Sequence, residues 1–441
     1  MLKPASIVLV CSTLLFVAMT ESLLSTPVSS TPLNREDVFD LLCACATANP
    51  SAGQIARIQS AVHSVFADSE QRTTKSDQRT TNSDPRTAND ENWREFLRLA
   101  EHHGVLPLVA RNLITHARGL PPEIEQSLRS SYEANLRRNL WFAAELIRIL
   151  RHFEQRQLRA LPFKGPVLAQ SAYGDLGLRS FSDLDLLISP ADFAQAKHAL
   201  GQMGYLPSKE TPPAVERLWL RNGYERSFDG PAAKNLLELQ WNSLPYFYAV
   251  DFRVGDFRFD DLMARARRIA LGPADVPCLS AEDSLLVQCL HAAKHLWTRL
   301  IWVTDIAESL RAPGIDFAVV LSRARDLGIA RILAVSLWLV ESLLGVDIPA
   351  ARALLQHDSA VPRLGKECAA RLSNAETYNL ESTAYFLHIL KLRDRRRDRW
   401  RYLWRLTFTP GPGDVSALPL PEPLFPLYRI VRIGRLLGKL I

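Results

Sequence analysis

Two aspartates that alternate with leucines constrain the fold of this chain more than any other feature. Asp183 and Asp185 lie in an apolar run. Successive side chains of a β-strand point to opposite faces, so both carboxylates would project from one face. Neighbouring carboxylates repel each other and are costly to desolvate unless a cation lies between them. The ordinary alternative is a solvated strand end, but apolar residues flank and interrupt the pair. The run therefore predicts a buried strand with a divalent metal site, and oxygen ligands suit Mg²⁺.

The residues around this pair resemble a known family. Gly165, Arg179 and residues 182–187 are similar to the signature of the nucleotidyltransferase superfamily related to DNA polymerase beta. Within it they resemble the bacterial group described as uncharacterised nucleotidyltransferases, in which Lys-Gly replaces the usual Gly-Gly or Gly-Ser. Here that pair is Lys164-Gly165, and Pro166 follows it. The resemblance implies an α+β fold with a small mixed palm sheet. It also implies transfer of a nucleoside monophosphate from a nucleoside triphosphate (NTP) to an acceptor hydroxyl, with Mg²⁺ or Mn²⁺.

The same resemblance implies a third carboxylate on a neighbouring strand. Glu238, within the alternating run 235–241, occupies that position. Asp183, Asp185 and Glu238 would then be both the metal ligands and the catalytic residues, with Glu238 activating the acceptor hydroxyl. Asp229 and Asp251 are weaker candidates, because neither lies in so regular an alternation.

Nucleotide-binding residues also follow from the resemblance. Lys164 and Arg179 would bring positive charge to the phosphates, and the Gly165 amide could contact a phosphate oxygen. Gln240 stands where related sequences tend to carry histidine, and its substitution is not expected to abolish turnover. The full set of expected nucleotide-binding residues is Lys164, Gly165, Arg179, Ser182, His291, Lys294 and His295.

The segment 291–295 carries a second motif. His291 and His295 are four residues apart, so they share one face of a helix. A zinc protease motif would need glutamate at position 292, where the chain has alanine. The resemblance includes His-x-x-Lys-His followed by Trp302 and Asp305, so we interpret the segment as a basic wall facing the nucleotide. Partly buried helix histidines are the alternative, and Asp305 would either pair with this wall or form an ordinary ion pair.

Two other functions stay open from the sequence. Pro166 and Gln240 are compatible with a catalytically degenerate member that binds a nucleotide or a partner without turnover. A zinc-dependent phosphohydrolase or peptidase built on the histidine pair is disfavoured by the missing glutamate. In the transferase interpretation the acceptor could be a sugar, an antibiotic-like small molecule, a protein hydroxyl or RNA. The oligomeric state is left open.

Charge is distributed unevenly along the 441 residues. Residues 391–441 hold 12 Lys or Arg and four Asp or Glu, so this tail has a net charge of +8 and the remainder −2. The tail is a candidate for contact with an anionic surface, although a charge run is usually a solvated helix face.

The six cysteines show no Cys-x-x-Cys spacing, which is typical of free thiols in a reducing compartment.

Residues 5–19 form an apolar run after Lys3, as in a signal peptide. Export would separate an NTP-dependent enzyme from its substrate, so we expect a cytoplasmic protein. The alternatives are export or membrane association through this segment, or a true start at Met19.

Farther on, residues 69–89 repeat a seven-residue polar unit that cannot bury a core, which predicts disorder.

The expected organisation follows the changes in periodicity. A long helix is predicted from about 122 to 157, and strands near 159–163, 224–228, 236–241 and 252–259. The predicted segments are an apolar N-terminus (1–30), N-terminal helices (31–68), a disordered repeat insertion (69–91), a helical region (92–158), a nucleotidyltransferase palm domain (159–275), a C-terminal helical domain (276–392) and a basic, Pro-containing tail (393–441).

Overall fold

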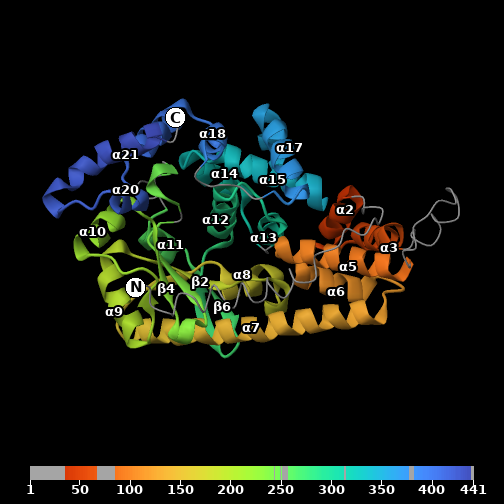
Figure 1. Cartoon of the computed structure of the whole chain (residues 1–441). Helices are drawn as coiled ribbons and strands as arrows, with labels where there is room; N and C mark the ends of the chain where they lie inside the picture. Colours follow the sequence, from red (N-terminus) through yellow and green to blue (C-terminus); the bar gives the residue numbers. More distant parts are fainter. Residues whose placement is uncertain are drawn as a thin grey trace.

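The chain has a mixed sheet at its centre and helices at both ends, as the α+β prediction requires. The structure is a computed structural model that describes residues 35–66, 85–242, 244–248, 250, 257–311, 314–376 and 382–438. Figure 1 shows the N-terminal helices beside the sheet, the C-terminal helices above it, and the long α7 along the underside of both. The apolar segment 1–30 and most of the repeat, residues 69–84, lie outside the described residues.

The N-terminal helices follow the apolar periods of the sequence. They are α2 (Arg35–Cys45), α3 (Ala52–Phe66), α5 (Pro85–His102), α6 (Leu106–His116) and α7 (Pro122–Glu154). The predicted disorder is wrong for residues 85–91, which form the first turns of α5. Pro85 explains the start, because the fixed φ of proline suits the first helical position, where an N–H has no partner.

Helix α7 supports both the sheet and the loop that precedes the aspartates. Phe142, Leu146 and Phe153 pack from it into the same core as the sheet leucines. Two buried asparagines face the loop: the Asn135 side-chain amide donates to the Gly177 carbonyl (2.8 Å), and that of Asn139 donates to the carbonyls of Leu176 (2.6 Å) and Arg179 (2.8 Å). Because buried carbonyls need partners, these bonds hold the loop against the helix.

The central sheet has the strand order β1-β2-β5-β4-β3. Its strands are β1 (Ala160–Pro162), β2 (Asp183–Ile188), β3 (Leu206–Pro207), β4 (Glu225–Asp229) and β5 (Leu236–Gln240), and the helices between them are α8 (Gly165–Leu168), α9 (Phe193–Gln202) and α10 (Pro213–Asn222). β2 pairs with β5 in parallel, and every other pair in this sheet is antiparallel. Leu184 and Leu186 of β2 and Leu237 and Leu239 of β5 pack in the core with α7 and α9, so the alternating acids face the opposite side.

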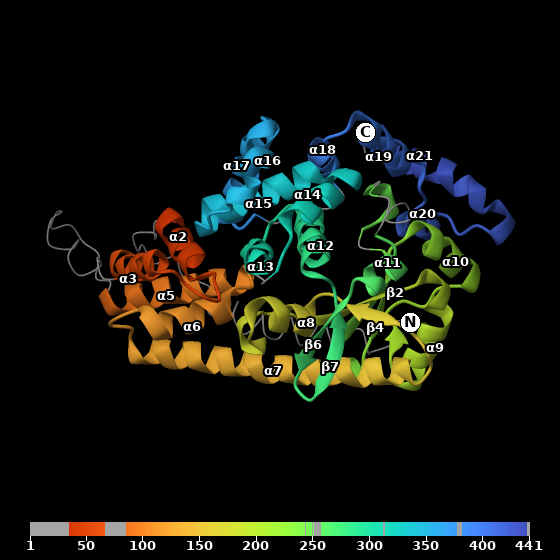
Figure 2. The same ribbon diagram turned by 180° about the vertical axis from the view of Figure 1, so that it is seen from behind.

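The predicted strand at 252–259 is wrong over its described residues. Residues 257–258 lie in a turn, and α11 (Phe259–Ala264) begins where the strand was expected to end. The carboxylate of Asp261 accepts from the Arg258 backbone N–H (3.2 Å), which stabilises the helix start. A separate two-stranded sheet follows, formed by β6 (Arg267–Leu271) and β7 (Ala274–Cys278), and Figure 2 shows it next to α8. Gly272, at φ +56°, makes its tight turn.

The C-terminal region is helical throughout its described residues. Its helices are α12 (Ala281–Lys294), α13 (Leu300–Leu310), α14 (Phe317–Asp326), α15 (Ala330–Leu344), α16 (Arg352–His357), α17 (Ala360–Ser373), α18 (Thr383–Leu392), α19 (Arg396–Phe408), α20 (Pro412–Ala417) and α21 (Tyr428–Gly438). The Ser280 side chain caps α12 by accepting from the Asp283 N–H (3.2 Å). No helix in the described part of the chain is both long and apolar enough to cross a bilayer.

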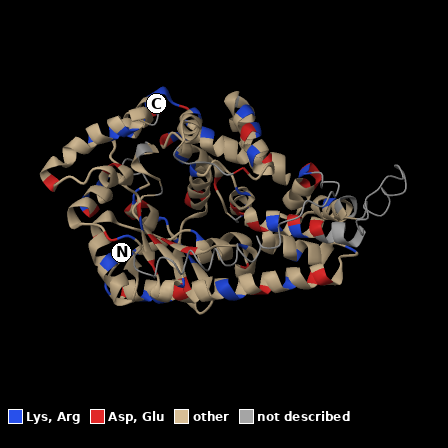
Figure 3. Ribbon diagram, viewed as in Figure 1, with Lys and Arg blue, Asp and Glu red and all other residues tan. Residues whose placement is uncertain are grey.

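The basic tail folds into α19–α21 at the outer edge of the molecule, where Lys and Arg appear along the ribbon in Figure 3. Some of this charge is neutralised internally. Asp414 is fully buried, and the guanidinium groups of Arg432 (3.3 Å) and Arg435 (2.5 Å) pair with its carboxylate. Contact of the remaining surface with an anionic partner stays a prediction.

Candidate active site

Strands β2 and β5 bring the three predicted carboxylates together. Asp185 lies directly opposite Glu238 in the parallel register. One side-chain oxygen from each of Asp183, Asp185 and Glu238 lies within 4.8 Å of the other two, close enough for one cation to be bound by all three. In the described part of the chain no other group of three or more His, Cys, Asp or Glu side chains is arranged in this way. The histidine pair therefore has no third ligand for zinc among those residues.

Two side chains place donors on this acidic cluster. Lys164 Nζ lies 2.8 Å from Asp185 Oδ1, and both side chains are buried. The amide nitrogen of Gln240 donates to the same Asp185 oxygen (3.0 Å) and to Glu238 Oε2 (3.0 Å). Asp185 Oδ1 thus has two donors within the protein, and Asp185 Oδ2 is the oxygen left for a metal. The contact of Gln240 with both acids was missed from the sequence, although its spacing of two from Glu238 places it on the same face.

The cluster carries more negative charge than its protein neighbours neutralise. Burial and the Asp185 charge raise the pKa of the Asp183 carboxyl. Burial, together with Asp185 and Glu225, raises the pKa of Glu238 to about 8. Burial opposes the charge on Lys164, but the surrounding carboxylates still raise the pKa of its ammonium above the ordinary value. A divalent cation would relieve this repulsion, and the all-oxygen donor set suits Mg²⁺ or Mn²⁺.

Gly165 allows the backbone to approach β2 closely. It has a φ of +54°, and a Cβ atom there would lie 3.4 Å from the Asp183 carbonyl oxygen. Lys164 precedes it with an extended backbone, and α8 begins directly after it. The strained conformation favours glycine and places the start of α8 beside the carboxylates. Ser182, which precedes the pair, is exposed and lines the cavity.

Arg179 lines the cavity too, but its guanidinium is paired within the protein. Its Nε and one terminal nitrogen donate to the two carboxylate oxygens of Asp305, at 2.8 and 2.9 Å. The Tyr173 hydroxyl donates to the same carboxylate (2.6 Å). Burial opposes the charge, but Asp305 raises the pKa of Arg179. Asp305 therefore forms an ion pair with Arg179, one of the two outcomes considered for it, and phosphate binding by Arg179 stays a prediction.

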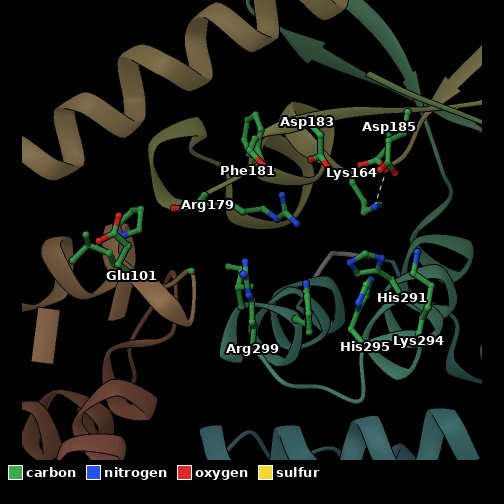
Figure 4. Close-up of a pocket in the computed structure, with 18 of the residues that line it drawn as sticks. Glu101, Lys164, Arg179, Phe181, Asp183, Asp185, His291, Lys294, His295 and Arg299 are labelled. Carbon is green, nitrogen blue, oxygen red and sulfur yellow. Dashed lines mark ion pairs between the residues drawn. The ribbon is translucent and has the colours of Figure 1, made fainter. Parts of the chain in front are cut away.

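Helix α12 presents His291, Lys294 and His295 to the cavity, opposite the carboxylates (Figure 4). The His295 ring stacks on Trp302, with ring centroids 4.8 Å apart. Burial and nearby cations lower the pKa of His291 well below its ordinary value and that of His295 to about 3. Both imidazoles are thus neutral near pH 7, and the positive charge of this wall comes from Lys294.

Lys294 is partly buried, and its ammonium has few partners among the described residues. Its Nζ donates to the Tyr224 hydroxyl (3.1 Å), and no carboxylate of the described residues lies within ion-pair distance of it. Burial lowers the pKa of Lys294, while Glu225 opposes that shift. The Tyr385 hydroxyl of α18 donates to the Lys294 carbonyl (2.7 Å), which connects the C-terminal helices to the cavity wall. These tyrosines and Glu225 were not predicted, because segments far apart in the chain bring them here.

The three carboxylates, Lys164, Arg179 and the basic wall of α12 line one cavity of about 1040 Å³. Its walls come from the palm sheet, from α12 and α13, and from the N-terminal helices α5–α7. Binding cavities for drug-sized ligands are about 300–1000 Å³. The cavity therefore has room for a nucleotide and a second molecule together.

Replacing Gln240 with leucine should weaken Mn²⁺ binding by about 10- to 100-fold, the usual effect of losing a partner that orients metal ligands. Both Asp185 and Glu238 lose a donor in this variant. The measurement is a Mn²⁺ titration followed by electron paramagnetic resonance. The control is Gln240→His, which keeps a ring N–H. Equal Mn²⁺ affinity in wild type and the leucine variant would show that the amide does not orient the ligands.

Comparison with known proteins agrees with this arrangement. A family model described as "Uncharacterised nucleotidyltransferase" matches residues 89–345, which is more than half of the chain and includes all three carboxylates, Lys164 and the wall of α12. No match was found among curated proteins or among solved structures. The chain belongs to the uncharacterised nucleotidyltransferase family.

Proposed function

We propose that this protein is a Mg²⁺-dependent nucleotidyltransferase of the DNA polymerase beta-like superfamily, which moves a nucleoside monophosphate from an NTP to an acceptor hydroxyl. The observation that carries the proposal is the convergence of Asp183, Asp185 and Glu238 within 4.8 Å at the wall of a large cavity, in a member of a nucleotidyltransferase family. A bound metal would neutralise charge on the triphosphate and lower the pKa of the attacking hydroxyl.

The protein's own groups have distinct tasks in this reaction. Asp183, Asp185 and Glu238 would hold the metal. Glu238 would also accept the proton of the acceptor hydroxyl while the hydroxyl oxygen forms a bond to the α-phosphorus. The bond from the α-phosphorus to the bridging oxygen breaks, and pyrophosphate leaves with that electron pair.

Two lysines are the best candidates to hold the phosphates. Lys294 is a partly buried ammonium that donates to a tyrosine hydroxyl, so an anion in the cavity would complete its contacts. Lys164 keeps donors beyond the one aimed at Asp185, since an ammonium has three hydrogens. Lys164 lies next to the carboxylates and Lys294 faces them across the cavity, so the reacting phosphate would lie between the two (Figure 4). Dependence on NTP favours a cytoplasmic location.

Metal removal tests the proposal directly. With Mg²⁺ or Mn²⁺, wild-type protein should bind one or more of the four ribonucleoside triphosphates and slowly release pyrophosphate. With EDTA the release should fall to the background rate, because nothing then offsets the charge of three carboxylates and a triphosphate. Calorimetry measures the binding, and a coupled assay measures the pyrophosphate. Nucleotide binding without turnover would favour a degenerate binding protein, and no binding at all would overturn the proposal.

A further inference from the structure

The cavity extends well beyond the carboxylates. At its other end the lining comes from the turn between α5 and α6, from one face of α7 and from the start of α13. In Figure 4 Glu101 lies on the opposite side of Arg179 from Asp185, and Arg299 lies below the Arg179 side chain. None of the three carboxylates proposed to hold the metal lies at this end of the cavity.

Two arginines line this end, and rigid elements hold both. Arg138 projects from α7, and one of its terminal nitrogens donates to the Asn135 side-chain oxygen (2.8 Å), while Asn135 is itself bonded to the Gly177 carbonyl. Arg299 directly precedes α13, whose first residues are bonded to His103: the Ile301 N–H donates to its carbonyl (3.0 Å). The backbone positions from which both arginines project are therefore fixed.

Like Lys294, and unlike Lys164 and Arg179, these arginines lack an anionic partner among the described residues. Lys164 pairs with Asp185 and Arg179 with Asp305. In contrast, neither Arg138 nor Arg299 has a carboxylate of the described residues within ion-pair distance. Burial lowers the pKa of Arg138, and Glu101, which lines the same end, only partly opposes that shift and does not form an ion pair with it. Two guanidinium groups thus leave this end with an excess of positive charge.

We propose that Arg138 and Arg299 form an anion subsite that binds a phosphate or carboxylate group of the acceptor, so that the acceptor is an anionic hydroxyl compound. The planar fork of a guanidinium matches both kinds of oxyanion. This inference rests on the proposed function for its meaning. Lys164 and Lys294 would hold the triphosphate between the carboxylates and α12, which leaves the end lined by Arg138 and Arg299 for a second molecule.

Inorganic phosphate serves as the probe. It is titrated into wild-type protein saturated with Mg²⁺ and an α,β-methylene NTP analogue, so that the triphosphate positions are filled. We expect phosphate to bind this complex, and the Arg138→Gln, Arg299→Gln double variant to bind it at least about tenfold more weakly, because charge-assisted hydrogen bonds are lost. Affinity for the analogue should change less than about twofold, the range expected without a direct contact.

The matched control is Arg137→Gln, the neighbouring arginine on α7, which is exposed and pairs with Glu133 on the same helix (3.6 Å). Its phosphate affinity should equal that of wild type. If the double variant bound phosphate as tightly as wild type, the subsite would be overturned. If it lost affinity for the NTP analogue alone, the arginines would bind the triphosphate, and the subsite would be overturned as well. Titrating phosphate into protein without metal or nucleotide separates the subsite from the proposed transferase function. If wild type binds phosphate and the double variant does not, the subsite is supported even if no nucleotide binds.

Discussion

Replacing Asp183 and Asp185 together with asparagine should lower pyrophosphate release by more than about 10³-fold, because the variant loses two of three charged metal ligands. Asparagine keeps the size of each side chain, so the strand should remain intact. The main effect is on charge: the cluster would retain Glu238 alone beside Lys164, which is too little to attract a divalent cation strongly. Mn²⁺ titration should show the loss of binding that accompanies the loss of turnover.

Asp229→Asn is the matched control for this experiment. Asp229 was the weaker candidate on the same sheet, and the structure places it exposed at the end of β4, where it accepts from the Ser208 hydroxyl (2.8 Å). Its substitution should leave turnover unchanged. If the double variant were as active as wild type, the aspartate pair would be structural, and partner binding and the histidine pair would become the hypotheses to pursue.

Removing Asp305 should destabilise the fold by about 3–5 kcal/mol, the usual effect of leaving one member of a buried ion pair alone. In Asp305→Ala the guanidinium of Arg179 and the hydroxyl of Tyr173 both lose their carboxylate partner in the interior. The measurement is the free energy of unfolding in urea. The control is Asp275→Ala, which breaks an ion pair with Arg268 whose side chains are 59% and 60% exposed, and which should cost less than about 1 kcal/mol.

A combined variant separates stability from nucleotide binding. In Tyr173→Phe, Arg179→Met, Asp305→Leu the whole buried network becomes apolar, so most of the lost stability should return. If this variant folds and binds NTP like wild type, Arg179 supports the fold and does not bind phosphate. If it folds but binds NTP weakly, the phosphate role predicted for Arg179 is supported. A variant no more stable than Asp305→Ala would mean that the pair itself contributes net stability.

Several features of the site were predictable because they depend on local periodicity. The alternation around Asp183 and Asp185 and around Glu238 predicted β2 and β5. The turn at Gly272-Pro273 between two alternating runs was also a usable signal, and it was missed. The strand expected at 252–259 is wrong at its last residue, Phe259, where α11 begins. Asp260 and Asp261 lie in the first turn of this helix, a position that acidic residues stabilise.

The sequence by itself determined which strands and helices carry the chemical groups, because a side chain's face follows from the period of its own segment. Only the tertiary structure decided that β2 pairs in parallel with β5, so that Asp185 meets Glu238. It also decided that Arg179 pairs with Asp305, a residue 126 positions away. Likewise, burial beside Lys164 and Lys294 leaves the histidines of α12 neutral. These outcomes depend on contacts and desolvation between distant segments, and local periodicity carries no information about either.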